Sequence, residues 1–514
     1  MKKLFISAIF CVFLCCVLKA QQKNALFDKI DAYNKTFPKE KLYLSFDKSY
    51  YNVGDTLWFK SFLLSGNLGQ TNLSDKIYVE LYNDSSKLVE IKAIALNNGL
   101  GYGDFALDKK LNAGTYTIRA YSNWQQNFGS DYFFQKSIYV GNVGTKTWLV
   151  DSYQKLSTVA NKNTLNLKIR LSNINNKPAG LQDVEVYLMS NKKKLMKADL
   201  QTNLDGKIET SIPLADQINA TYSFYIVDKK DPAKKAIVPI LLQGVEELDL
   251  QFMPEGGYLV NDMYTKVAFK AVSPDGMGKT VNGKIVNSKN ETVATFSSQH
   301  KGMGSFFLLA QKGETYTAVY NLNGKEKRKD LPNAKQEGTT LRIDHLSKPD
   351  SLLIYIKATE TKRSDQNYSL VAQGADQITM ATAVNLKNGF SNLKLAKNNF
   401  TDGITHFTLF SPDQLPLNER SVFINHKQHI KLNLATHKSS YQNRDSVAVE
   451  ITAANETGVP LSGTFSVSIT DNSQVKQEQH EENIISNFLL QSEVRGHIED
   501  PGWYFSNQEP ATRT

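Results

Sequence analysis

The chain has 514 residues, a formal net charge of +9 at neutral pH, 41% hydrophobic residues and 22% charged residues. This composition is typical of a folded globular protein and excludes an intrinsically disordered chain. The length is enough for about three to five domains. Basic residues are interleaved with acidic ones and form only short runs, such as Lys192-Lys193-Lys194, so the sequence predicts no nucleic-acid partner.

The first twenty residues have the pattern of an export signal. Lys2 and Lys3 precede an apolar run over residues 4–18, and Ala20 is a small residue suited to cleavage by signal peptidase. A transmembrane helix needs about 20 apolar residues, so this run is short for a membrane span. We predict a signal peptide over 1–20. A retained membrane anchor and a lipoprotein modified at Cys15 or Cys16 are the alternatives.

All three cysteines, Cys11, Cys15 and Cys16, lie in this predicted signal. Cleavage after Ala20 would leave 494 residues with a charge of +6 and no cysteine. Disulfides, thiol nucleophiles and cysteine–metal sites are therefore excluded from the mature chain. No later segment approaches membrane-spanning length. We expect an exported chain without a transmembrane span, in the periplasm, associated with the outer membrane, or extracellular.

A short helix is predicted ahead of a long series of strands. Leu26, Ile30, Tyr33 and Phe37 have helical spacing, and Pro38 ends the pattern, so we expect a helical lead-in within 21–38. From there the apolar period is two, which is typical of antiparallel strands with one buried face. Turn signals such as Asp205-Gly206 separate the strands. The clearest alternations cover 77–81, 116–120, 165–171, 248–252, 447–451 and 465–469.

A repeat of about 100 residues is visible beneath these strands. Gly101-Tyr-Gly103-Asp-Phe105-Ala-Leu107 is echoed by Gly302-Met-Gly304-Ser-Phe306-Phe-Leu308, with looser copies at Gly206 and Gly389. This period is the size of an immunoglobulin-like sandwich. We predict an all-β chain of tandem β-sandwiches with domains at 39–145, 146–245, 246–335, 336–428 and 429–514, the last one either a full or a truncated module.

Several segments resemble the alpha-2-macroglobulin superfamily, in particular its second macroglobulin domain as found in long secreted proteins of Bacteroidetes-type bacteria. The most specific match is Tyr51-Asn-Val-Gly54-Asp55-Thr-Leu-Trp58-Phe59-Lys60. Weaker matches are Gly114-Thr-Tyr116 through Trp124, Phe252-Met-Pro254-Glu255-Gly256-Gly257, Phe407-Thr-Leu-Phe410 with Pro416-Leu-Asn-Glu419-Arg420, and Phe465-Ser-Val-Ser-Ile-Thr-Asp471. Together they span most of residues 40–471.

The resemblance implies a secreted, non-enzymatic, macroglobulin-like protein that binds or inhibits endopeptidases. Family members that trap proteases use a protease-sensitive bait segment and an internal Cys-Gly-Glu-Gln thioester. The thioester is absent here, and the sequence does not point to a bait segment. Relatives of this bacterial type often continue into a regulatory β-domain and a TonB-receptor plug. The alternative is therefore an interaction module of a TonB-dependent outer-membrane receptor system, and either reading implies a protein or peptide partner.

Two groups of residues are candidates for roles beyond the core. Tyr51, Gly54, Asp55, Trp58 and Lys60 of the family motif fit a structural role, because Gly54 suits a positive φ and Asp55 can bond the turn. Tyr121, Trp124 and Phe128, with Tyr132 nearby, follow a strand and could form a partner or sugar-stacking surface. Packing within or between sandwiches is the other use of these rings.

The sequence predicts no catalytic, cofactor or metal site. His426 and His429 form the one close histidine pair, but the spacing places them on opposite faces of a strand and no further ligands follow. Ser-x-x-Lys occurs at Ser45, Ser190 and Ser298 without companion motifs. An enzyme, such as a glycan-active one with paired carboxylates, is the third class of function, because carboxylates that meet only in space cannot be read from spacing.

Overall fold

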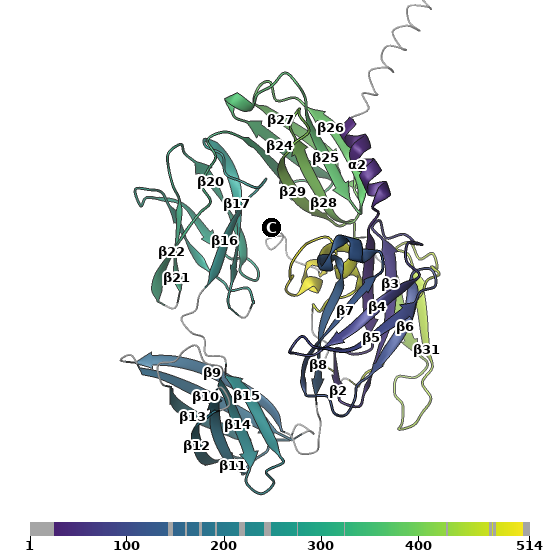
Figure 1. Cartoon of the computed structure of the whole chain (residues 1–514), viewed down its shortest axis with the longest axis vertical. Coiled ribbons are helices and arrows are strands. Elements are labelled where there is room, and N and C mark those ends of the chain that lie inside the picture. The colour runs from purple at the N-terminus through teal and green to yellow at the C-terminus, as the bar shows by residue number, and fades with distance from the viewer. Residues whose placement is uncertain are drawn as a thin grey trace, which may run out of the picture.

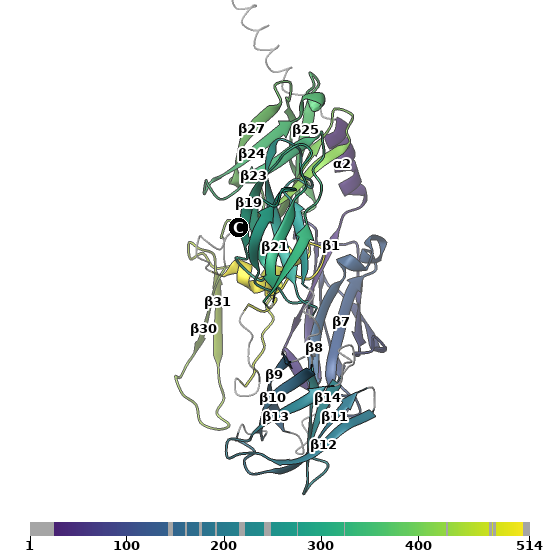
Figure 2. The same ribbon diagram turned by 90° about the vertical axis from the view of Figure 1, so that its left-hand side faces the viewer.

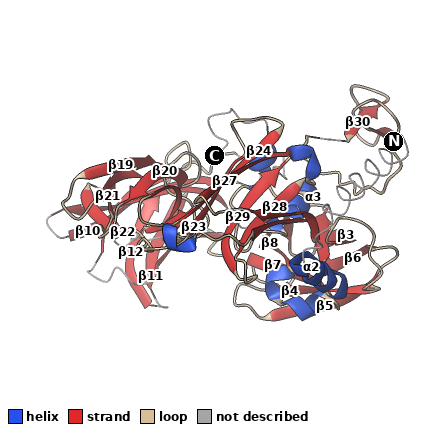
Figure 3. Cartoon of the chain, turned by 90° about the horizontal axis from the view of Figure 1, so that it is seen from above, coloured by secondary structure: helices blue, strands red, loops and turns tan. Residues whose placement is uncertain are grey.

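The computed structural model describes residues 25–141, 148–159, 162–173, 177–190, 193–214, 222–240, 248–274, 276–322, 324–427, 430–471, 475 and 480–506. The chain is all-β, as predicted, and consists of tandem immunoglobulin-like sandwiches with only short helices (Figure 1, Figure 3). The predicted signal peptide over 1–20 lies outside the described residues. Among the described residues, no helix has the length and hydrophobicity to cross a membrane.

The lead-in is a single helix, α2 (Ala25–Thr36), and it ends before Pro38 as the spacing predicts. Leu26 is buried, whereas Tyr33 and Phe37 are exposed and pack against each other with ring centroids 5.1 Å apart. The helix lies along the fourth sandwich of the chain (sandwich 4, residues 339–424), where the Lys29 ammonium donates to Gln414 Oε1 at 3.0 Å. Its apolar stripe is therefore only partly covered.

Sandwich 1 covers residues 40–141 and packs a three-stranded sheet on a five-stranded one. Its fully buried core includes Leu44, Leu57, Ile77, Phe105 and Ile118. All strand pairs are antiparallel except β2 with β8. The sheet order β1-β3-β6 uses β1 (Glu40–Phe46), β3 (Thr56–Ser65) and β6 (Leu100–Ala106). The order β2-β8-β7-β4-β5 uses β2 (Tyr50–Asn52), β8 (Phe134–Gly141), β7 (Gly114–Ser122), β4 (Lys76–Tyr82) and β5 (Leu88–Ala95).

Sandwich 2 lies within 149–240 and repeats this arrangement with one three-stranded and one four-stranded sheet. Its apolar alternation, at Leu165, Leu167, Ile169 and Leu171, faces the core as predicted. The sheet order β13-β10-β9 uses β9 (Leu149–Val159), β10 (Lys162–Ser172) and β13 (Lys207–Leu214). The order β12-β11-β14-β15 uses β11 (Asp183–Ser190), β12 (Lys193–Gln201), β14 (Tyr222–Asp228) and β15 (Lys235–Ile240).

Sandwiches 3 and 4 have the same strand order again. Sandwich 3 pairs β16 (Asp249–Pro254), β17 (Met263–Val272) and β20 (Met303–Ala310), and in its second sheet β19 (Thr292–Ser297), β18 (Asn282–Val286), β21 (Thr317–Leu322) and β22 (Lys325–Asp330). Sandwich 4 pairs β23 (Thr339–Asp344), β24 (Ser351–Ala358) and β27 (Phe390–Ala396), and in its second sheet β26 (Gln377–Val384), β25 (Tyr368–Gly374), β28 (Gly403–Phe410) and β29 (Pro416–Ile424).

The repeat seen in the sequence marks the entry to β6, β13, β20 and β27, one in each sandwich. Gly99, Gly206, Gly302 and Gly389 all have φ between 73° and 80° there, and each carbonyl accepts a hydrogen bond from a backbone N–H at the end of β3, β10, β17 or β24. A Cβ on Gly302 would lie 2.2 Å from the Ala271 carbonyl oxygen, so only glycine fits. Gly103 and Gly304 are equivalent to each other but lie inside the strand. Matching Gly103 and Gly304 with Gly206 and Gly389 in the sequence repeat is therefore out of register, because the residues equivalent to Gly206 and Gly389 are Gly99 and Gly302.

The fifth predicted module differs from the structure. Within 429–514 the described residues form one two-stranded sheet, β30 (Lys431–Thr436) with β31 (Val449–Ala454), and no second sheet covers it. Figure 2 shows this hairpin standing apart from the sandwiches. The strand predicted over 465–469 is wrong, because the described residues provide no strand to pair with it.

Residues 480–506, here called the strap, form short helical turns instead of strands. They contain α3 (Ile484–Ser486), the π-helical turn η5 (Asn487–Gln491) and the 3-10 helix η6 (Pro501–Phe505). Asn483 caps α3 by accepting hydrogen bonds from the backbone N–H groups of Ile485 and Ser486, both at 3.0 Å. Pro501 begins η6 at a position where a missing N–H costs nothing. These local signals override any strand period.

Candidate partner-binding sites

The family motif forms a turn that is held by its own side chains. The Tyr51 hydroxyl donates to Asp47 Oδ1 at 2.7 Å, and the Lys48 ammonium pairs with Asp55 Oδ2 at 2.9 Å. Asp55 also accepts from the Asn52 N–H, and Gly54 takes a φ of 87°. Burial would raise the pKa of Asp55, but Lys48 and the Asn52 N–H outweigh it and lower the pKa. These contacts give the motif a structural role.

Two motif residues point outward from β3 and differ in their surroundings. Leu57 and Phe59 face the core, whereas Trp58 is exposed. The Lys60 ammonium donates to Thr464 Oγ1 at 2.8 Å and to the Phe465 carbonyl at 3.0 Å. Lys60 thus fixes a segment four hundred residues later in the chain against sandwich 1.

The predicted partner surface at Tyr121, Trp124 and Phe128 is half-buried, and its polar atoms have intramolecular partners. The Tyr121 hydroxyl donates to Glu80 Oε1 at 2.9 Å, and its ring stacks on Phe133 with centroids 4.4 Å apart. The Trp124 Nε1–H donates to the Pro38 carbonyl at 2.6 Å. Phe128 packs on the Trp124 ring at 6.1 Å. In the structure Trp124 thus ties Pro38, at the end of the lead-in, to sandwich 1, and the other two rings pack beside it or within the sandwich.

A segment rich in exposed apolar side chains follows the β30–β31 hairpin. Residues 461–471 have no secondary structure, and nearly all are exposed; Val467 is 61% and Ile469 89% exposed. On the hairpin itself, the register places Leu434 opposite Ile451 and Thr436 opposite Val449 on one face, with Leu432 beside them. These four apolar side chains are exposed too. We call residues 461–471 the exposed segment.

The strap anchors the C-terminal part of the chain to sandwich 1. Phe488 is buried in the core of sandwich 1, 6.1 Å from the Tyr43 ring centroid. The Lys41 ammonium and the Glu493 carboxylate form an ion pair whose side chains are only 8% and 17% exposed. The Lys136 ammonium pairs with Glu481 Oε1 at 2.9 Å. Removing one partner of such a buried pair costs about 3–5 kcal/mol, so this anchor is strong.

The other end of the strap reaches sandwich 3. The Lys301 ammonium contacts Glu499 Oε1 and Asp500 Oδ2, both at 2.8 Å, and the Gly278 N–H donates to Glu499 Oε2 at 2.9 Å. Burial would raise the pKa of Glu499, but Lys301 and the Gly278 N–H outweigh it and lower the pKa. The Trp503 indole stacks on the His300 ring. Burial, and then the charge of Lys301, lowers the pKa of His300.

Sandwich 4 also touches both sandwich 1 and the strap. Phe505 meets the Phe423 ring edge-on with centroids 5.4 Å apart. Asp376, in the turn between β25 and β26, accepts from the Lys39 N–H at 2.9 Å. Burial raises the pKa of Asp376 despite this contact. Because the strap contacts sandwiches 1, 3 and 4, it fixes their relative positions.

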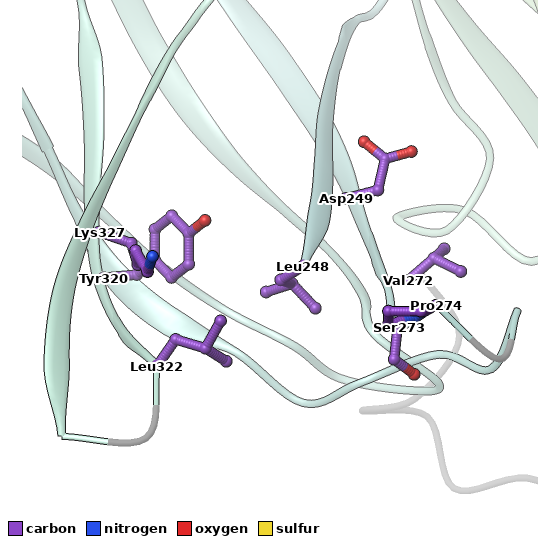
Figure 4. Close-up of a pocket in the computed structure, with 8 residues that line it drawn as sticks. All are labelled: Leu248, Asp249, Val272, Ser273, Pro274, Tyr320, Leu322 and Lys327. Atoms are coloured by element: carbon purple, nitrogen blue, oxygen red, sulfur yellow. The ribbon is translucent and has the colours of Figure 1, made fainter. Parts of the chain in front are cut away.

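Two cavities accompany this arrangement. One, of about 650 Å³, lies between α2, sandwich 1, sandwich 4 and the strap, with charges of both signs from Lys29, Lys39, Arg495, Asp131 and Glu493. The other, of about 490 Å³, opens at one end of sandwich 3 (Figure 4). Leu248 lies between Tyr320, Leu322 and Lys327 on one side and Val272, Ser273 and Pro274 on the other. Neither lining selects one ligand chemistry.

His426, the described member of the predicted histidine pair, has structural partners. The His426 backbone N–H donates to Asp402 Oδ1 at 2.5 Å, and the His426 Nε2 atom lies 2.8 Å from the Phe400 carbonyl oxygen. His429 lies outside the described residues. Within the described ranges, no three His, Cys, Asp or Glu side chains cluster in a way that could hold a metal ion.

Comparison with known proteins gives similarities in structure alone. No protein-family model and no curated protein matches the sequence. The chain is similar to Escherichia coli alpha-2-macroglobulin in its native conformation (12% identity, TM-score 0.33, covering 82% of this chain and 31% of that one) and in its trypsin-activated form (12%, 0.34, 82% and 33%). It is also similar to Salmonella alpha-2-macroglobulin reacted with methylamine (12%, 0.33, 82% and 32%).

This chain therefore spans about a third of the length of those bacterial alpha-2-macroglobulins. At these TM-scores the likeness identifies neither a family nor an activity for the chain.

Proposed function

We propose that this chain is an exported, non-enzymatic, macroglobulin-like protein that binds endopeptidases and does so without a thioester. The observation that carries the proposal is the exposed segment. Peptidases bind their substrates as extended strands. Residues 461–471 belong to no helix or strand of the protein, are nearly all exposed, and alternate apolar with small polar side chains from Phe465 to Thr470. The segment thus presents what a peptidase cleft recognises.

The surroundings of the segment support binding as well as cleavage. Within its first half it is fixed by Lys60, whose ammonium donates to the Thr464 hydroxyl and to the Phe465 carbonyl. Downstream the strap is fixed by Phe488, the Lys41–Glu493 pair and the Lys301 ion pairs. A peptidase that takes the segment therefore sits beside sandwich 1. After a cut, both new ends remain attached to the protein by non-covalent contacts.

The test is to mix the purified chain with a panel of endopeptidases of different specificity. We expect at least one of them to co-migrate with the chain on size exclusion and to lose activity on a large protein substrate while keeping activity on a small peptide. If no peptidase in the panel is bound or slowed, the proposal fails.

A second candidate is an interaction module of a TonB-dependent receptor system at the outer membrane. The apolar face of β30–β31 favours it, because a two-stranded hairpin with one uncovered apolar face gains stability by adding strands from a partner. Cell fractionation separates the two candidates. Recovery of the chain with an outer-membrane receptor after a high-salt wash would favour the second, and recovery in the soluble exported fraction would favour the first.

A further inference from the structure

Sandwiches 3 and 4 meet at a fixed junction. Glu255 follows β16, its side chain is only 6% exposed, and its Oε1 accepts from the Ile343 N–H at 3.1 Å and from Arg420 Nε at 3.0 Å. Asn418 Nδ2 donates to the Gly256 carbonyl at 2.9 Å. These contacts hold the β23 and β29 strands of sandwich 4 against the end of β16, so side chains on the two sandwiches keep a set geometry.

A row of four planar groups crosses this junction. The Tyr264 and Phe307 rings, on neighbouring strands of sandwich 3, stack with centroids 5.2 Å apart and planes 2° from parallel. The Arg342 guanidinium carbon lies 5.2 Å from the Phe307 centroid and 5.5 Å from the Tyr355 centroid. Tyr264, Phe307 and Tyr355 are all exposed, so the row lies on the surface. An arginine held between two rings has its N–H donors preorganised.

Two cations at this junction, Arg342 of the row and Lys266 beside it, have no hydrogen-bonded counter-ion among the described residues. Neither the Arg342 guanidinium nor the Lys266 ammonium makes a hydrogen bond or ion pair with another residue that the structure describes. Lys266 lies directly opposite Phe307 in the β17–β20 register. Burial lowers the pKa of Lys266, and Arg420 and Arg342 lower it further against the opposing charges of Glu255 and Asp344. An incoming anion would relieve this repulsion.

The nearby acids already bind groups other than Arg342 and Lys266, although the buried Glu255 Oε2 has no hydrogen-bond partner in the part of the chain that the structure describes. Glu255 binds Arg420, and Asp344 accepts from the Ser347 and Leu346 N–H groups at 2.9 and 3.0 Å. Five N–H donors on Arg342 and three on Lys266 are therefore available for carboxylate oxygens from outside. A planar guanidinium suits a carboxylate in bidentate geometry.

The rings and the aliphatic neighbours favour a peptide over a sugar as the source of the carboxylate. The stack covers one face of the Tyr264 ring and one face of the Phe307 ring, and Arg342 also lies over the Phe307 ring, so little ring surface is left for a sugar to stack on. Leu309, opposite Tyr264, and Met253, opposite Ala268, expose aliphatic surface on the same sheet. Tyrosine, phenylalanine, methionine and arginine together are the side chains enriched at protein interfaces.

We propose that Arg342, Lys266 and the rings of Tyr264, Phe307 and Tyr355 bind an acidic peptide segment of a protein partner. Its Asp or Glu carboxylates pair with Arg342 and Lys266, and its apolar side chains pack beside Leu309 and Met253. This surface is separate from the exposed segment and does not depend on peptidase binding.

The test measures binding of fluorescent acetyl-Glu-Leu-Glu-Leu-Glu-amide to the full chain by anisotropy. The matched probe is acetyl-Gln-Leu-Gln-Leu-Gln-amide, and oligogalacturonate is the competitor that represents acidic glycans. The variants are Arg342→Ala, Arg342→Lys and Lys266→Ala. Lys235→Ala, which removes an exposed charge on β15 of sandwich 2, is the control. Circular dichroism melts confirm that each variant is folded.

We expect the Glu peptide to bind and the Gln peptide not to bind. Arg342→Ala should weaken binding about tenfold or more, because a charged hydrogen-bonded pair is lost. Arg342→Lys should weaken it less, and Lys235→Ala should not change it. Failure of the Glu peptide to bind at millimolar concentration, unchanged affinity in Arg342→Ala, or Arg342-dependent binding of oligogalacturonate that matches or exceeds that of the peptide would each overturn the proposal. None of these outcomes depends on a peptidase.

Discussion

The imidazole ring of His300 lies parallel to the indole ring of Trp503, with centroids 3.5 Å apart and planes 9° from parallel. One residue belongs to the loop before β20 of sandwich 3, and the other lies two hundred residues later in the strap. Beside them Lys301 pairs with Glu499 and Asp500. This contact joins the C-terminal part of the chain to the middle of the molecule.

Trp503→Ala should release the end of the strap from sandwich 3 without unfolding either part. A stacked aromatic pair contributes about 0.5–1.5 kcal/mol beyond the apolar area it buries. Amide hydrogen exchange over residues 498–506 should therefore become about tenfold faster, while exchange in the core of sandwich 3 stays the same. Trp58→Ala, which removes an exposed indole, is the control. Unchanged exchange in the strap would show that the stack does not hold it.

The junction of the strap with sandwich 3 should weaken in acid. The pKa of the His300 imidazole is lowered in the folded protein, so its contribution to stability is full above about 6.5 and is lost as pH falls through the lower folded value. The pKa of Glu499 is also lowered, so its contribution is lost below about 4.5. Both effects have the same sign.

Strap exchange measured from pH 7.5 to 3 should accelerate in two steps. His300→Gln should remove the step that begins near pH 6.5, and Glu499→Gln should remove the more acidic one. A profile that is flat over this range, or that shows slower opening in acid after correction for intrinsic exchange, would contradict the assignment.

Phe488→Ala should destabilise sandwich 1, although Phe488 lies about 350 residues beyond the last strand of that sandwich. The ring belongs to the buried core around Tyr43. A buried Phe→Ala change costs about 3–5 kcal/mol. The melting transition assigned to sandwich 1 should fall by about 10 °C or more. Phe390→Ala, which truncates an exposed ring on β27, should leave all transitions within about 2 °C. Equal effects of the two variants would refute the packing of Phe488.

Gly302→Ala should be far more damaging than Gly313→Ala, although both glycines have positive φ. A Cβ at Gly302 would meet the Ala271 carbonyl oxygen at 2.2 Å, whereas nothing lies within 4 Å of a Cβ at Gly313. Backbone strain alone costs about 1–2 kcal/mol, and overpacking adds about 1–3 kcal/mol. Chemical denaturation followed at sandwich 3 should separate the two variants by at least about 1 kcal/mol, and a smaller difference would argue against the shared glycine turn.

The sandwiches could be predicted from the sequence because their signals are local. Alternation at 165–171 or 248–252 assigns a strand and its buried face, and a glycine just before β6, β13, β20 or β27 recurs in each copy. The register of that repeat was the weaker part, because Gly103 and Gly304 pack under Phe59 and Phe269 within the strand while Gly99 and Gly302 make the turn. Both pairs look alike in the sequence.

The strap and the sandwich 3–4 junction could not be predicted, because their contacts join residues that are distant in the chain. Nothing in the spacing of Lys41 and Glu493, or of Phe307 and Arg342, brings them together. The cluster Pro501-Gly-Trp503-Tyr504-Phe505 beside Glu499 was the one local hint, since such aromatic side chains need a surface to pack on. The strand predicted at 465–469 is wrong because alternation is a local signal, whereas a strand also needs a neighbouring strand from elsewhere in the chain.

The most direct test of the account is to map the first peptide bond that endopeptidases cut in the native chain. Elastase, subtilisin and a chymotrypsin-like enzyme are applied at low ratios, and the products are identified by mass spectrometry before and after size exclusion. We predict that the first cut falls within 461–471 and that the C-terminal fragment still co-elutes with sandwiches 1 and 3. First cuts elsewhere in the chain, or immediate loss of that fragment, would contradict the account.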